Sequence, residues 1–248
     1  TGHGGGTVLH VAQLGTPSAP DDAGGSEQGC AAVPVAAERS GAPALQVRDI
    51  PRDLSCAGLR QAAAGSLAEP APGSAAVHLL LGLGGDGVDP VVAVVSPGCV
   101  LPVVGGPGSG KSSFLQAMEQ IHSERAASAG STAGPRTAIH WLDDADSLPP
   151  QQIAEASLSL AAGGVIVAAF SHPGPALSRL PLEWGLRTIQ QGVVVMPQRP
   201  GDAELFGVRL ETMGTEPQGR AVLLERGRSR WFQFPHDTVS AAPGRHRG

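Results

Sequence analysis

Aromatic residues are scarce in this chain of 248 residues: tyrosine is absent, and aromatic side chains make up only 3% of the sequence. The hydrophobic content of 41% is ordinary, so we expect a core of Val, Leu, Ile and Ala, which suits parallel strands covered by helices. No apolar run approaches the roughly 18 residues of a transmembrane helix, and residues 1–6 are not typical of a signal peptide. We therefore expect a soluble piece of a longer protein that makes no membrane contact of its own.

Cysteine and lysine are rare as well. The three cysteines, Cys30, Cys56 and Cys99, are widely spaced and form no C-x-x-C or Cys/His pattern, which argues against a zinc site or a disulfide framework. The 17 basic residues are outnumbered by 22 acidic ones, and the net charge of −5 provides no basic field for nucleic acid. Lys111 is the only lysine in the chain.

That lysine stands in GGPGSGKS, residues 105–112, which is a complete G-x-x-x-x-G-K-[ST] phosphate-binding loop. In such a loop the glycines let backbone N–H groups surround the phosphates, the lysine reaches the outer phosphates and the serine hydroxyl binds Mg²⁺. An apolar strand precedes the loop and an apolar-periodic helix follows it, which is the required order. The sequence therefore predicts binding of ATP and Mg²⁺ by Gly105, Gly106, Pro107, Gly108, Ser109, Gly110, Lys111, Ser112 and Ser113.

A second carboxylate site follows the apolar stretch 138–142. Asp143, Asp144 and Asp146 end this run in the manner of a Walker B strand. Asp143 would act on Mg²⁺ from its second shell, opposite Ser112, and Asp144 would polarise the attacking water. The alternative is that these aspartates only cap the next helix. With Lys111, Asp143 and Asp144 are the candidate catalytic residues.

The remaining pattern predicts three regions: 1–76 with a short strand at 8–12 and a Gly/Ala/Pro-rich linker over 15–45, a nucleotide-binding domain over 77–236, and a flexible tail over 237–248. Within the first region, 44–51 could form an edge strand and 57–64 a helix. In the domain we expect strands at 91–95, 100–104, 137–142, 165–170, 193–196, 221–224 and 231–234, and helices at 111–127, 151–160 and 183–191.

Taken in order, these segments resemble the FtsK/SpoIIIE family of P-loop motors, and in particular the later modules of actinobacterial type VII secretion multi-ATPase proteins. The likeness covers 77–235 and rests on LGGDGVDP at 83–90, the loop at 105–112, DDAD at 143–146, VIVAA at 165–169, Ser178 and Arg179, PGDAELFG at 200–207, and GRAVLL at 219–224 leading to Gln233. Residues 7–12 are similar to the last strand of a preceding module.

The resemblance implies an α/β fold of the RecA-like P-loop NTPase type, with a mostly parallel sheet and helices on both faces. It also implies a cytoplasmic domain of a membrane-anchored protein, other ATPase modules in the same polypeptide, a ring oligomer, and DNA or a secreted protein as the transported substrate. His172 would sense the γ-phosphate, and Arg179 would act as an arginine finger on a neighbouring subunit.

One departure from the family is marked. A further strand and helix lie in the family between the phosphate loop and the Walker B strand, but the turn-rich stretch after the loop's helix leaves no room for them before Asp143. Asp144 is also one methylene shorter than the usual glutamate. We therefore expect slow or absent hydrolysis. The alternatives are a non-catalytic module that docks a secreted substrate or regulates an upstream ATPase, and a small-molecule P-loop kinase.

Overall fold

A computed structural model describes residues 48–64, 75–171 without 129–136, 173–211 and 216–236. The expected strand at 8–12, the linker at 15–45 and the tail at 237–248 lie outside the described residues. Among the described helices, none is both long and apolar enough to cross a membrane.

The described strands form one curled eight-stranded sheet in the order β2-β1-β8-β7-β6-β3-β5-β4. The strands are parallel only from β6 through β3 and β5 to β4. The pairings β2-β1, β1-β8, β8-β7 and β7-β6 are antiparallel. The strand bounds are β1 Val77–Gly84, β2 Asp89–Val95, β3 Val100–Val104, β4 Ile139–Leu142, β5 Val165–Phe170, β6 Gln191–Val195, β7 Arg220–Glu225 and β8 Arg228–Gln233.

The expectation of a mostly parallel sheet is therefore wrong. The two consecutive pairs β1-β2 and β7-β8 are joined by short turns, and a short turn can connect only antiparallel strands. The parallel part is limited to the strands that are connected through helices.

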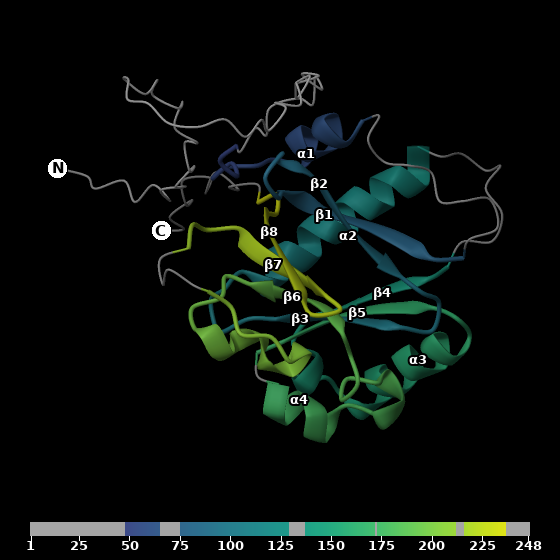
Figure 1. Ribbon diagram of the computed structural model, residues 1–248. Helices are drawn as coiled ribbons and strands as arrows, with labels where there is room; N and C mark the ends of the chain where they lie inside the picture. The colour runs from purple at the N-terminus through teal and green to yellow at the C-terminus, as the bar shows by residue number, and fades with distance from the viewer. Residues whose placement is uncertain (1–47, 65–74, 129–136, 172, 212–215, 237–248) are drawn as a thin grey trace, which may run out of the picture. The chain divides into compact units, whose positions relative to one another are not determined.

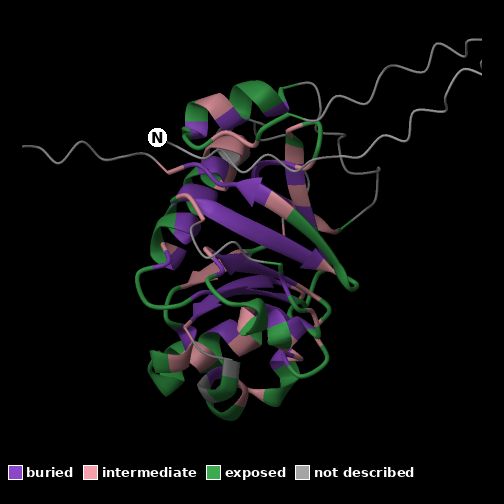
Figure 2. Ribbon diagram, turned by 60° about the vertical axis from the view of Figure 1, so that its left-hand side comes forward, coloured by how far each residue is buried: buried purple, intermediate pink, exposed green. Residues whose placement is uncertain are grey.

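Helices cover both faces of the sheet, as the sequence predicts (Figure 1). Alternate residues of β5 point to opposite faces: Val165 and Val167 pack in a core with α1 and α2, and Ile166 and Ala168 pack in a second core with α3 and α4. Figure 2 shows the buried strands as the layer between these helices. The helices are α1 Cys56–Ala63, α2 Lys111–Ser128, α3 Pro150–Ala161 and α4 Pro173–Arg179, with 3₁₀ turns at Ala145–Ser147 (η1), Leu182–Trp184 (η2) and Pro200–Phe206 (η3).

Most expected elements are present, and two differ. The predicted helix over 183–191 is wrong: the chain forms only η2, turns at Gly185 in the left-handed region with φ of 67°, and enters β6 at Gln191. The edge strand expected over 44–51 is also not formed where the chain is described, because 48–51 are irregular and β2 and β4 are the edges of the sheet.

α1 belongs to the same core as α2. Ser55 caps its N-terminus by accepting a hydrogen bond from the N–H of Gly58 at 3.0 Å. Cys56, Leu59 and Ala63 are buried, and they join the core that contains Phe114 of α2.

Candidate functional site

The phosphate-loop sequence connects β3, which ends at Val104, to α2, which begins at Lys111. The loop is closed by a hydrogen bond from the N–H of Ser109 to the carbonyl of Gly106 at 3.1 Å. Gly108 and Gly110 have φ values of 74° and 93°, a region that side-chain-bearing residues rarely adopt. Gly106 and Gly108 face open space. The loop therefore presents backbone to solvent at the N-terminus of a long helix, where an anion is favoured.

Lys111 is only 7% exposed, and its ammonium donates to the carbonyl of Gly106 at 3.2 Å. The lysine thus reaches back across the loop instead of extending into solvent. Ser112 and Ser113 are exposed at the start of α2. The cation and the two hydroxyl-bearing residues therefore sit where the sequence places them, at the junction of loop and helix.

The base of the loop is tightly packed. A Cβ at Gly105 would collide with Ser109 Oγ and would lie 2.9 Å from the carbonyl of Val195 on β6. Ser109 is buried, and its Oγ has no hydrogen-bond partner in the described part of the chain. A glycine cradle with an unsatisfied buried hydroxyl fits a bound phosphate group, which supplies strong acceptor oxygens.

A pocket of about 450 Å³ opens beside the loop, and we call it the loop pocket. Sequence reasoning missed its outer wall, because Cys56, Gln120 and Phe234 come from distant segments that carry no local motif. Phe234 stacks edge-on against Phe114 of α2 with ring centroids 5.2 Å apart. The backbone N–H of His236 donates to the carbonyl of Leu54 at 3.0 Å, which ties the segment after β8 to the segment before α1.

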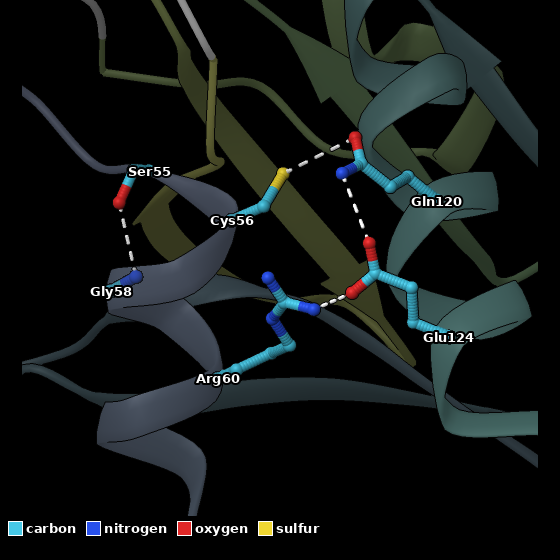
Figure 3. Close-up of polar contacts among 6 residues, drawn as sticks. All are labelled: Ser55, Cys56, Gly58, Arg60, Gln120 and Glu124. Carbon is cyan, nitrogen blue, oxygen red and sulfur yellow. Dashed lines mark hydrogen bonds and ion pairs between the residues drawn. The ribbon is translucent and has the colours of Figure 1, made fainter. Parts of the chain in front are cut away.

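Polar contacts hold α1 against α2 at this wall, as Figure 3 shows. The thiol of Cys56 lies 4.0 Å from Oε1 of Gln120, and the Gln120 amide donates to Oε1 of Glu124 at 3.1 Å. Arg60 of α1 forms an ion pair with Glu124. These contacts fix Cys56 and Gln120 as neighbours on the rim of the loop pocket.

The acidic residues after β4 and the phosphate loop after β3 both lie at the carboxyl ends of the parallel strands. Leu142 of β4 and Pro102 of β3 both pair with Ala168 of β5, so β5 separates the two strands. Since neighbouring strands are about 4.8 Å apart, the loop strand and the acidic strand are about 10 Å apart. A ligand that contacts side chains at the ends of both β3 and β4 must therefore span that distance.

Asp143 and Asp144 are exposed beyond β4. Oδ1 of Asp143 accepts the N–H of Asp144 at 3.1 Å, and Asp144 itself has φ of 43°. Asp144 is the N-cap of η1 but makes no side-chain capping bond. Its carboxylate is therefore not used for the helix cap that is the alternative interpretation of this segment.

The two lesser candidates are Arg179 and His172. Arg179 on α4 donates to the backbone carbonyl of Asp146 at 3.2 Å, so its guanidinium lies beside the acidic turn of its own chain. His172 lies outside the described residues. In the described ranges no group of three or more His, Cys, Asp or Glu side chains could hold a metal by itself. Mg²⁺ is often held by few protein ligands together with phosphate oxygens, and Ser112 and Asp143 are of the right chemical type for that role.

Solved structures provide the comparison. The region of EssC from Geobacillus thermodenitrificans that contains ATPases 2 and 3 superposes with a TM-score of 0.52 at 12% identity, over 75% of this chain and 45% of that one. The chain shares the fold of an ATPase domain. The cytoplasmic domain of EssC gives a TM-score of 0.49 at 16% identity, over 77% and 47% of the two chains. Thermomonospora curvata EccC, ATPases 2 and 3 in complex with a signal sequence peptide, gives 0.45 at 16%, over 76% and 44%.

The chain thus spans less than half the length of these structures. No protein-family model matches the sequence, and a comparison with curated proteins finds no match. At this level of identity the likeness concerns the fold.

Proposed function

We propose that this chain is the ATP-binding module of an FtsK/SpoIIIE-type motor for type VII protein secretion, with weak or no hydrolysis. The observation that carries the proposal is the loop at 105–112. It combines left-handed glycines, an open backbone and a buried lysine at the start of α2. The ATPase fold shared with EssC supports it.

In this proposal the backbone N–H groups between Gly106 and Lys111 surround the β- and γ-phosphates. Lys111 exchanges its bond to the Gly106 carbonyl for phosphate oxygens. Ser112 and Asp143 would hold Mg²⁺, which would neutralise phosphate charge when bound. The loop pocket receives the nucleoside, with Phe234 and Gln120 on its wall.

Slow turnover follows from the acidic edge. β4 is an edge strand of the sheet, and among the described residues no strand lies between α2 and β4. Asp144 has a short side chain at a backbone position with φ of 43°. Phosphoryl transfer depends on accurate placement of water, metal and a compensating cation. The short acid Asp144 follows the edge strand β4. This arrangement supports the proposal that the module binds ATP and hydrolyses it slowly.

The wider setting belongs to the same proposal: a cytoplasmic module of a membrane-anchored protein that acts beside other ATPase modules, in a ring, on a secreted protein. DNA is the less favoured substrate because the net charge is −5.

The proposal is tested by calorimetric titration of Mg²⁺-ATP into the folded chain. We expect saturable binding of one nucleotide per chain with a dissociation constant below about 1 mM. A folded protein that takes up neither ATP nor ADP at that concentration contradicts the proposal.

A further inference from the structure

A second pocket, of about 1090 Å³, lies beside the loop pocket and contains four arginines. We call it the arginine pocket. Its walls come from the segment 48–52, the turn after β1, the residues around the start of β7, and β8. Three distant segments each contribute to both pockets. They line the arginine pocket with 48–52, with 217 and 220, and with 229–231, and they line the loop pocket with Cys56, with 218 and 219, and with 234–236. The arginine pocket is therefore separate from the phosphate loop but shares its framework.

Arg220 is the central observation. It is only 8% exposed at the start of β7, and its Nη2 makes one long hydrogen bond of 3.4 Å to the carbonyl of Ile50. Its Nε is buried and has no hydrogen-bond partner in the described chain. Leaving a buried donor of a charged group unpaired is costly. The geometry thus holds a guanidinium ready for an acceptor that the described residues do not supply.

The surrounding charges point to an anion as that acceptor. Arg48, Arg52 and Arg230 are exposed and line the pocket together with Arg220. The opposing acids on the lining are Asp49 and Asp86. In the described residues no ion pair joins Arg52, Arg220 or Arg230 to an acid, so the positive charge exceeds the negative.

The electrostatics agree with this geometry. Burial lowers the pKa of Arg220, the charge of Glu216 opposes that shift, and the neighbouring charge of Arg52 adds to it. Arg52 and Arg220 are therefore close enough to repel each other. An oxyanion between them would remove the repulsion and satisfy the unpaired Nε, since guanidinium groups bind such oxygens through paired N–H donors.

We propose that the arginine pocket binds a phosphate-type oxyanion, held by Arg220 and Arg52 at its centre. The pocket volume leaves room for a phosphorylated small molecule around that group. This site is independent of the phosphate loop and does not require that ATP binds there.

The test titrates inorganic phosphate into the Lys111→Ala protein, in which the loop is disabled, and follows the arginine Nε–H resonances by NMR at constant ionic strength. We expect the Arg220 resonance to shift with a dissociation constant of about 1 mM. Arg52→Gln should weaken this binding by about tenfold or more. Arg228→Gln removes the same charge from the exposed start of β8, outside the pocket. It should change the dissociation constant for phosphate by less than about twofold.

Two further arms make the outcome decisive. Arg220→Lys keeps the charge but lacks the guanidinium fork. Followed on the Arg52 Nε–H resonance, it should also weaken binding while the far-UV circular dichroism stays unchanged. Succinate, a dicarboxylate of similar charge, should bind at least about fivefold more weakly than phosphate. No shift at about 10 mM phosphate, an equal loss in Arg52→Gln and Arg228→Gln, or equal binding of succinate would each overturn the proposal.

Discussion

Lys111 Nζ lies 3.2 Å from the carbonyl oxygen of Gly106 and donates a hydrogen bond to it across the phosphate loop. The only lysine in the chain is thus fixed by a hydrogen bond to the same loop in which it is expected to bind phosphate. Because its side chain is almost buried, the lysine loses little freedom when phosphate replaces that carbonyl.

Lys111→Ala should therefore abolish most nucleotide affinity. Two charge-assisted hydrogen bonds to phosphate oxygens are worth about 3 kcal/mol or more together, which corresponds to about a hundredfold rise in the dissociation constant for ATP. Calorimetric titration of wild type and variant measures it. An unchanged affinity in a folded variant would show that the nucleotide binds elsewhere.

The isolated chain should release phosphate from ATP very slowly, and Asp144→Glu should restore little. The longer side chain extends the reach of the acid, but β4 remains an edge strand. Steady-state phosphate release at high protein concentration measures this, with Lys111→Ala as the blank. Turnover of roughly one per second or faster would contradict the expected loss of activity.

Duplex DNA should bind weakly at physiological salt. The net charge of −5 provides little counterion release. Fluorescence anisotropy with labelled duplexes across a salt series tests this. Tight binding with a steep salt dependence would favour DNA over a secreted protein as the transported substrate.

The free energy of unfolding should decrease as the pH is lowered, because of His122 on α2. Burial, with the charge of Arg125 second, lowers the pKa of His122 from 6.5 to about 4. Between these values the unfolded chain binds a proton that the folded chain does not, so unfolding is favoured as the pH falls from 6.5 toward 4. The loss from this group at pH 5 is about 2 kcal/mol.

Urea unfolding at pH 7 and pH 5 measures this loss, and His122→Gln removes the titrating group. The variant should show a smaller loss than wild type over the same interval. Parallel losses in the two proteins would mean that other groups set the pH dependence.

Gly84→Ala should destabilise the protein by about 3 kcal/mol. A Cβ at Gly84 would collide with the carbonyl of Trp231, where β1 pairs with β8, and would lie 2.7 Å from the Cα of Phe232. Gly174→Ala is the matched control. Gly174 lies in α4, and a Cβ there would meet nothing within 4 Å. Urea unfolding should show a loss for Gly84→Ala alone.

The sequence predicts the parallel strands β3 and β5 well and also indicates β2, β7 and β8 of the antiparallel part, but it does not predict β1. β3 and β5 begin and end at the predicted residues, because apolar runs bounded by turn residues specify buried strands. Nothing local in Val77–Gly84 reveals that it pairs with β8 at the other end of the domain. The helix expected over 183–191 failed because Gly185 turns the chain and Gln191 pairs with Glu225 of β7.

The site divides in the same way. The candidate phosphate loop can be recognised in the sequence because its chemistry fixes residue types at consecutive positions. The partners around it could not: Cys56, Gln120 and Phe234 meet only through the packing of α1 and β8 onto α2. Arg220 has no sequence signal either, because its proposed role as an anion ligand depends on burial beside the segment 48–52.

The place of β8 between β1 and β7 determines the order in which the sheet can be completed during synthesis. In the described chain, the hairpin of β1 and β2 joins the rest of the sheet only through β8, at Leu83 and Gln233. An isolated hairpin is marginally stable, so until β8 leaves the ribosome this early segment depends on its packing against α1 and α2. A nascent chain stalled before β8 would expose both the hairpin and the open edge of β7 to chaperones and proteases.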